Sequence, residues 1–457
     1  MSKMEGWSVR GQEKPVNGKS VRTEEKTNCS SWVVEMEKML VETDSSEEMA
    51  RWNKPSIYRV PEWIKDTTNS EAYRPQLVSL GPFHHGEPKL LPMEEHKRRA
   101  VLHQVKRAGK PLSEFVTAVE SVVDELQSAY YDLDDKWCGD NSSRFVEMMV
   151  TDGCFLLEFM KTTDPRQDHA DYAPNDPVFS QRGDHYLWAD IRTDMVVMEN
   201  QLPLLVLQKL LAISHDTPTS GKEIDNKVLE FLDCSVKEGI NNLGLHPLDL
   251  FHKSSCGPTS TCDQGSSQCK DDDIDSTPTI VELSEAGIHF KKSNTRRVND
   301  VEFKNGVLSM PYVAVYDETY KMFLNQMVFE RLHCDDAGTD VMDYIFFLDN
   351  IIDSGRDVAL LRSKGLFNNG LGTDNEAADL FNTLSKGTVM SKYSKLNNVQ
   401  RELNAHCMKR RNKWRANFVQ TYLSNPWVFI SLVAAIILLV SSFLQTVYTI
   451  VPFYTRS

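Results

Sequence analysis

The chain has 457 residues, of which 40% are hydrophobic, enough to bury the core of one large domain or two ordinary ones. Its formal net charge of -14 argues against a general nucleic-acid-binding protein, because contacts to phosphates need a basic face. Nine cysteines without regular spacing favour reduced thiols over the disulfide framework of a small secreted domain.

Residues 1–53 are polar and of mixed charge, which is typical of a flexible arm. They lack the apolar stretch of a secretory signal, so we expect nothing at this end to direct the chain into the secretory pathway. Within the arm, Trp32, Val33, Met36 and Leu40 recur at helical spacing and predict one short helix. From residue 54 to 415 we expect a helical domain.

Three stretches predict helices at the centre of this domain. Between Pro111 and Asp134 the apolar residues recur at the spacing of one helix face, which predicts a single helix packed on a core. Residues 144–160 and 194–213 are apolar on more than one side and predict central helices. The second of these should break or restart at Pro203.

The next part of the chain predicts a loop and then a small β element. Residues 254–278 lose all periodicity and are rich in Ser, Cys, Gly and Asp, as expected of a loop. Two short alternating runs then flank Asn305-Gly306, a dipeptide favoured where a two-residue turn needs positive φ twice. We therefore predict a β-hairpin here.

Helical patterns resume at Glu318 and continue toward the C-terminus. Glycine-rich residues 365–372 predict a loop before a helix at Asn375. A long helix is expected over 391–424, with an apolar stripe formed by Leu396, Val399 and Leu403. The predicted fold is mainly α with a small β-hairpin element (α+β), plus one C-terminal transmembrane helix.

The C-terminal segment carries the membrane signal. No Asp, Glu, Lys or Arg occurs over 416–455, and about 20 apolar residues suffice for a helix to span the hydrocarbon core. We predict a transmembrane helix over 427–450, with Pro452 just past its end, and a short tail over 451–457. Five cations precede the span: Lys409, Arg410, Arg411, Lys413 and Arg415.

Only Arg456 is positively charged beyond the span, so the positive-inside rule predicts a cytosolic N-terminal domain and tail-anchored topology. We expect the plasma membrane, and the five cations could also attract anionic lipid. Glycosylation sequons at Asn28 and Asn141 would be used only if the domain faced a lumen.

The stretch "LVSLGPFHHGEPKL" is the first candidate site, and we call Gly81, Pro82, His84, His85 and Gly86 the hallmark turn. With Glu94, Glu95 and His96 nearby, the ligand types would suit a metal or catalytic site. However, adjacent side chains in an extended segment point to opposite faces, and the spacing matches no metal pattern. We favour a turn whose imidazoles hydrogen-bond to nearby groups.

A second candidate site contains His252, Cys256, Cys262 and Cys269, followed by Asp271 to Asp273. Zinc sites normally pair close cysteines, and no Cys-x-x-Cys occurs here, so we favour a solvated loop with incidental thiols. Nucleophile-elbow, phosphate-loop and kinase motifs do not occur either. The acids in "EWIKD" and "ENQLP" are expected on solvated faces or at caps. We therefore predict no metal, no cofactor and no enzymatic activity.

Several phrases together resemble the plant domain-of-unknown-function 247 (DUF247) family over about residue 55 to the end. They are "IYRVP", "AYRPQLVSLGPFHHG", "MEEHKRR", "MMVTDGCFLLEF", "MENQLPLLVLQKL", "VELSEAGIHF", "FKNGVLSMP", "GTDVMDYIFFLDNIIDSGRDVALLRSKG" and "SNPWVFISLVAAIILL". The chain departs from the family pattern at "VTDGCF", at "SMP" and in the loop over 254–278. Variable loops of this kind are where recognition specificity is expected.

The resemblance implies a plant membrane-associated protein with one C-terminal span and no established enzymatic activity. It carries over no catalytic residue, and it marks the hallmark turn only as a family feature. Some family members are similar to the pollen-side self-incompatibility determinants of grasses, and the family has also been linked to development and stress responses.

The main hypothesis is a non-enzymatic, tail-anchored recognition or signalling protein that binds a protein partner beside a membrane. One alternative is a metal-dependent enzyme built on His84, His85, Glu95 and His96. Another is a structural membrane scaffold.

Overall fold

The computed structural model describes eleven stretches of the chain, and every structural statement below concerns them. They are residues 31–42, 55–162, 172–215, 217–234, 243–256, 277–333, 337–388, 390–391, 394–418, 421 and 426–455. By its contacts the chain divides into two units, Met1–Lys54 and Pro55–Ser457. In the first unit the structure describes α1 (Ser31–Glu42), whose apolar side chains Trp32, Met36 and Leu40 are exposed.

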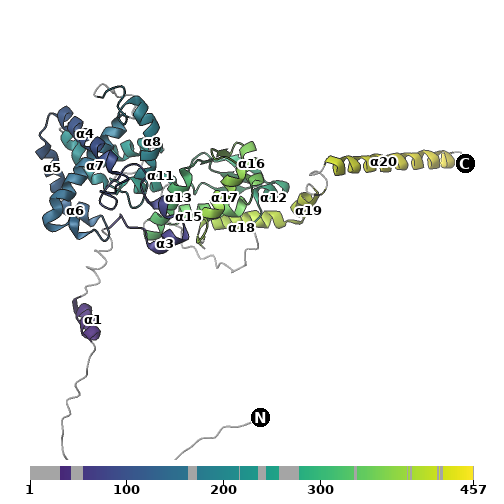
Figure 1. The fold of residues 1–457 in the computed structure, drawn as a ribbon. Helices are drawn as coiled ribbons and strands as arrows, with labels where there is room; N and C mark the ends of the chain where they lie inside the picture. The colour runs from purple at the N-terminus through teal and green to yellow at the C-terminus, as the bar shows by residue number, and fades with distance from the viewer. Residues whose placement is uncertain are drawn as a thin grey trace, which may run out of the picture. The chain divides into compact units, whose positions relative to one another are not determined.

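The first part of the second unit is built from helices around α7 (Ser142–Thr162), which packs against α4, α5 and α9 (Figure 1). The elements of this part are α3 (Glu62–Thr67), η1 (Ser70–Tyr73), α4 (Leu91–Ala108), α5 (Leu112–Glu120), α6 (Val123–Ser128), η2 (Asp135–Trp137), η3 (Gly139–Asn141), α7, α8 (Gln181–Met195), α9 (Leu204–His215), α10 (Gly221–Phe231) and α11 (Pro247–Cys256). Helix α7 is buried on more than one side, and α9 begins just after Pro203, as the sequence predicts.

The single helix predicted between Pro111 and Asp134 is wrong, because α5 and α6 are separate. The break falls at Ser121 and Val122. The Ser121 hydroxyl donates to the carbonyl of Ala118, a local bond that competes with the helix ladder. Val122 leaves helical geometry with φ -129 and ψ 16.

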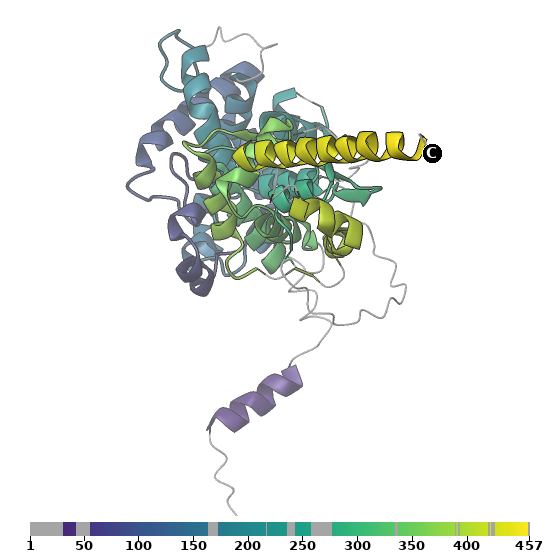
Figure 2. The same ribbon diagram turned by 90° about the vertical axis from the view of Figure 1, so that its right-hand side faces the viewer.

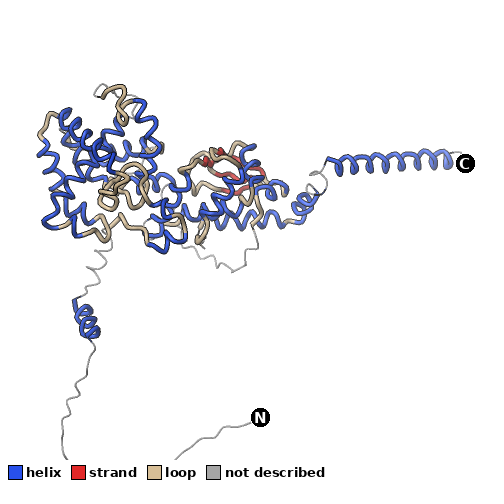
Figure 3. Tube along the Cα trace, in the orientation of Figure 1, coloured by secondary structure: helices blue, strands red, loops and turns tan. Residues whose placement is uncertain are grey.

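In the part of the chain that the structure describes, five short strands form two small sheets (Figure 3). In the first, β1 (His289–Lys292) runs parallel to β3 (Val307–Met310), and β2 (Glu302–Lys304) is antiparallel to β3. In the second, β4 (Val313–Val315) runs parallel to β5 (Phe367–Asn369). The sequence predicts only the hairpin β2–β3, which the structure confirms. It places β5 in a loop, and that prediction is wrong.

The hairpin turn has the geometry that Asn305-Gly306 predicts, since Asn305 has φ 52 and Gly306 has φ 79. We expect Gly306→Val to lower the free energy of unfolding by about 1 to 2 kcal/mol, because a residue with a Cβ is strained at positive φ. Asn305→Gly should be nearly neutral. Thermal unfolding of the two variants in detergent measures the difference, and equal midpoints would contradict the predicted turn strain.

The rest of the second unit is again helical. Its helices are α12 (Ile280–Glu285), α13 (Thr319–Leu332), α15 (Asp340–Ile351), α16 (Gly355–Ser363), α17 (Asp374–Leu384), α18 (Lys395–Met408), α19 (Arg410–Phe418) and α20 (Pro426–Thr455). Helix α20 is a single uninterrupted helix in both ribbon views (Figure 2). The fold is therefore mainly α with small β elements and one long apolar C-terminal helix, which confirms the predicted class.

The continuous helix predicted over 391–424 is wrong, because α18 ends at Met408 and α19 begins at Arg410. Lys409 has ψ 128, outside the helical region. The side-chain amide of Asn412 donates to the carbonyl of His406 at 2.8 Å, and the backbone N–H of Lys409 donates to the same carbonyl, so this last turn of α18 is capped where the helix ends. The predicted stripe of Leu396, Val399 and Leu403 is buried, as expected.

Helix α20 differs from the predicted span at its C-terminal end. It continues through Pro452 to Thr455, whereas the prediction ends the span at 450 and assigns 451–457 to a tail. Most of the predicted tail is therefore helical, and residues 456–457 lie outside the described residues.

Candidate functional site

The segment leading into the hallmark turn is irregular, and its backbone amides donate to buried side chains instead of a neighbouring strand. Three different acceptors take part: Asp194 at the end of α8, Asn200 before α9, and Asp152 within α7. The bonds are Gln76 N to Asp194 at 2.8 Å, Leu77 N and Val78 N to Asp194 at 2.7 and 3.0 Å, Leu80 N to Asn200 at 2.7 Å, and Gly81 N to Asp152 at 2.8 Å. These side chains satisfy amides that would otherwise be buried without partners.

Asp152 also forms a buried ion pair with Lys97 of α4. The Lys97 ammonium lies 2.7 Å from Asp152, 2.6 Å from Glu94 and 2.6 Å from the carbonyl of Ser79. Both Lys97 and Asp152 are almost completely buried. Burial raises the pKa of Asp152, and the adjacent Lys97 partly opposes that shift.

The two histidines of the hallmark turn have different neighbours. His84 is buried, with Nδ1 2.7 Å from Glu87 Oε1 and Nε2 3.4 Å from Glu199 Oε2. His85 packs edge-on against Trp137, with ring centroids 5.4 Å apart. The two imidazoles therefore do not converge on one point.

The metal cluster considered at His84, His85, Glu95 and His96 is not formed. Glu95 is exposed, and Nδ1 of His96 lies 3.0 Å from Nη1 of Arg99. Within the described ranges, the His, Cys, Asp and Glu side chains whose ligand atoms gather within 4.8 Å are those of His252, Cys256 and Glu330.

The structure also corrects the expectation for "ENQLP", whose acid Glu199 is buried instead of solvated. Glu199 lies 2.9 Å from the ammonium of Lys65 and accepts the amide of Val60 at 2.6 Å. Burial acts to raise the pKa of Glu199, but its bonds from His84, Lys65 and Val60 lower it overall. By contrast, Glu62 in "EWIKD" is mostly exposed, as expected.

His252 and Cys256 likewise do not lie in a solvated loop. Both belong to α11, where they are 3% and 4% exposed. The loop predicted over 254–278 therefore starts too early, because α11 continues to Cys256. Residues 257–276 lie outside the described residues, and they include Cys262, Cys269 and Asp271 to Asp273. Glu330, the third member of this cluster, lies on α13 and was missed, because nothing local in the sequence links it to α11.

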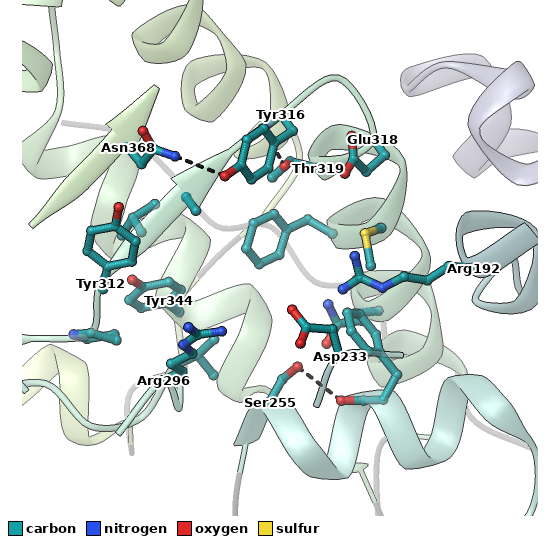
Figure 4. A pocket seen from close by; sticks show the side chains of 18 of the residues that line it. Arg192, Asp233, Ser255, Arg296, Tyr312, Tyr316, Glu318, Thr319, Tyr344 and Asn368 are labelled. Carbon is teal, nitrogen blue, oxygen red and sulfur yellow. Dashed lines mark hydrogen bonds between the residues drawn. The ribbon is translucent and has the colours of Figure 1, made fainter. Parts of the chain in front are cut away.

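A cavity of about 600 Å³ opens beside the second sheet (Figure 4). It is bounded by residues from α8, α11, β4, α13 and α15. Polar and aromatic side chains line it: Trp188, Arg192, Asp233, Phe251, Ser255, Arg296, Tyr312, Tyr316, Glu318, Thr319, Phe323, Gln326, Tyr344 and Asn368. The sequence does not predict this cavity, because its walls come from seven separate parts of the chain.

The cavity combines aromatic faces, charged groups and hydrogen-bonding side chains. The Arg192 guanidinium lies 5.1 Å from the ring centroid of Trp188, while Asn368 donates to the Tyr316 hydroxyl at 2.9 Å. The Ser255 hydroxyl donates to the carbonyl of Phe251 at 3.0 Å, so it is not paired with a base. Aromatic faces and charged groups of both signs could hold a small ligand or the side chains of a protein.

The basic residues before α20 lie at the end of α18 and on α19. Lys409 and Arg410 are exposed, and the guanidinium of Arg415 lies against the backbone of Gly287. Trp414 of α19 is also exposed. Of the side chains of Arg411 and Lys413 the structure gives no description, so their predicted role stays a prediction.

Helix α20 is long and apolar enough to cross a membrane. Its apolar part is Trp427–Tyr448, 22 residues with a mean hydropathy of 2.6, and none of it is buried against the protein. A core helix of the same composition would be mostly covered, as α9 is.

These features define a mainly helical domain followed by one long apolar helix, and comparisons with known proteins place the chain in a family. A model of the DUF247 family, described as a plant protein of unknown function, matches residues 57–441. The chain belongs to this family.

Two relatives come from Arabidopsis thaliana. The UPF0481 protein At3g47200 is 29% identical over 427 residues, covering 87% of this chain and 86% of the relative. The putative UPF0481 protein At3g02645 is 22% identical over 521 aligned positions, which cover 91% of this chain and 93% of the relative. No solved structure matches the chain.

Proposed function

We propose that the protein is a non-enzymatic recognition protein that α20 anchors in a membrane. The observation that carries this proposal is the 22-residue apolar stretch Trp427–Tyr448, none of which is buried against the protein. Burying such a surface in the hydrocarbon core removes it from water. The helix makes this possible, because its backbone groups hydrogen-bond to one another within the segment.

The distribution of charge supports a cytosolic location for the large domain. Five cations precede α20 over 409–415, and only Arg456 follows the apolar stretch. Positive residues are retained on the cytosolic side, so we place the domain in the cytosol with tail-anchored topology, at the plasma membrane.

Two observations support recognition over catalysis. The buried charged groups around the hallmark turn are used in structural bonds, as the Lys97–Asp152 pair illustrates. The cavity beside β4 combines aromatic and charged side chains, which suits selective binding. We infer that the partner is a protein, and that the role is of the kind played by those family members that are similar to the pollen-side self-incompatibility determinants of grasses.

Ending the chain at Phe418 is expected to move the protein from the membrane pellet to the soluble fraction, because no apolar helix of spanning length remains. The full-length chain should stay in the pellet after alkaline carbonate extraction. Immunoblotting of both fractions from plant cells measures this. A full-length chain released by carbonate would contradict membrane anchoring.

The same full-length chain serves to test the orientation of the domain in the membrane and its protein partners. Asn141 is exposed, so its sequon would be glycosylated if the domain faced a lumen. A mobility shift on glycosidase treatment would contradict a cytosolic domain. Proximity labelling should mark a reproducible set of protein neighbours that the chain ending at Phe418 loses, and identical sets would argue against recognition at the membrane.

A further inference from the structure

A cluster of three potential metal ligands lies between α11 and α13, outside the features used above. His252 and Cys256 are four residues apart on α11 and therefore share one helix face. Nε2 of His252 lies 2.8 Å from Glu330 Oε1 and 3.3 Å from Cys256 Sγ. All three side chains are at most 4% exposed.

We propose that His252, Cys256 and Glu330 bind a divalent cation of the zinc type. This site is independent of the proposed membrane anchoring and recognition.

The ligand chemistry favours a borderline-soft cation over magnesium or calcium. An imidazole nitrogen, a thiolate and a carboxylate are zinc ligands, whereas hard cations prefer sites made only of oxygen. Two residues at i and i+4 on one helix, completed by a residue from another helix, give the spacing that helical zinc sites use.

Charge balance also favours a cation of charge two. A thiolate and a carboxylate together carry two negative charges and the neutral imidazole none, so a bound zinc ion makes the buried cluster neutral. Without the cation, a buried thiolate or carboxylate has a large desolvation cost.

The surroundings hold the ligands in place. Glu330 accepts the amides of Val341 and Met342 at 2.8 and 2.9 Å, which orients its carboxylate. The ring of Phe329 lies 5.2 Å from that of His252 and limits its rotation. At ligand distances of about 2.0 to 2.3 Å, a tetrahedral ion needs Nε2 of His252 to lie about half an ångström farther from the Glu330 oxygen, and less than that farther from the Cys256 sulfur.

Two other interpretations of the His252, Cys256 and Glu330 cluster are a metal-free hydrogen-bonded cluster and a catalytic relay. In a metal-free cluster, the Nε2–H of His252 donates to the Glu330 carboxylate, and the sulfur of Cys256 lies beside the same nitrogen. A catalytic Cys-His-Glu relay would need the two ring nitrogens of His252 to face different partners. Both partners instead lie against Nε2, so the geometry does not support a relay.

The test measures the metal content of the untagged full-length protein, purified in detergent without chelators. We expect about one zinc per chain and, after exchange, a near-ultraviolet thiolate-to-cobalt charge-transfer band with Co²⁺. Cys256→Ser should lose the band, and His252→Ala should lose the metal. Cys154→Ala is the matched control, because Cys154 is another buried cysteine, in α7, whose thiol pKa burial raises to about 12.

A wild-type protein that is folded, carries no metal and shows no thiolate band with Co²⁺ would overturn the proposal. So would a band that persists in Cys256→Ser. If His252→Ala does not fold, the wild-type metal content and the Cys256→Ser spectrum still decide the question.

Discussion

Replacing Asp194 with alanine is expected to abolish or nearly abolish folding of the domain. Asp194 is fully buried and accepts the amides of Gln76, Leu77 and Val78, and it lies 3.2 Å from the ammonium of Lys321. Each buried amide left without a partner costs about 1 to 3 kcal/mol. The bond of Val78 is buried and those of Gln76 and Leu77 are partly buried, so losing all three removes a large part of the stability of about 5 to 15 kcal/mol that is typical of a domain.

Chemical denaturation of the full-length protein in detergent measures the effect, and Asp190→Ala supplies the control. Asp190 lies one turn earlier on α8 and is exposed, so its removal should change the midpoint little. Asp194→Asn should fall between the two, because an amide retains one acceptor oxygen. If Asp194→Ala and Asp190→Ala have the same midpoint, Asp194 does not stabilise the segment as described.

Lys97→Met is expected to lower the free energy of unfolding by about 3 to 5 kcal/mol, because it leaves the buried carboxylate of Asp152 without its counter-ion. The methionine fills a similar volume, so the loss comes from charge more than from packing. The measurement is again the denaturation midpoint of the full-length protein.

The pH dependence separates these two causes. Burial already raises the pKa of Asp152, and removing Lys97 removes a group that lowers it. A carboxyl whose pKa is higher in the folded state than in the unfolded state favours folding most at low pH. Its contribution to the stability of the protein is complete below the unfolded pKa and is lost as the pH rises through the folded pKa. The deficit of Lys97→Met should therefore be small in acid and grow toward neutral pH.

Adding Asp152→Asn to Lys97→Met should remove most of this pH dependence, because the asparagine cannot ionise but still accepts the amide of Gly81. A deficit that is equal at all pH values in both variants would show that packing, and not the unpaired carboxylate, causes the instability.

Local signals predicted the elements that local chemistry determines. Asn305-Gly306 predicted the hairpin, because these two adjacent residue types readily adopt the two positive φ angles that the turn needs. The pairing of β4 with β5 joins Val313 to Phe367, and three-residue strands are too short to show alternation. The breaks at Val122 and Lys409 were missed, because side-chain bonds to the backbone ended helices whose apolar stripes continue.

The candidate sites also divide into features that the local sequence predicts and features that depend on residues far apart in the chain. The turn at the paired histidines was predicted from its glycines and prolines, whereas the burial of Glu199 depends on Lys65 and His84, far away in the chain. His252 and Glu330 are 78 residues apart, so no motif could have joined them. The cavity walls are likewise assembled only by the fold.

The segment from Gln76 to Gly81 tolerates little change in its length. Successive amides in it are matched to acceptors on three different parts of the fold, and the φ of Gly81 is +74 where a Cβ would meet the carbonyl of Gln201. Inserting or deleting one residue would misalign every donor after it. The segment therefore limits chain length more strictly than it limits side-chain identity, and engineered insertions belong elsewhere.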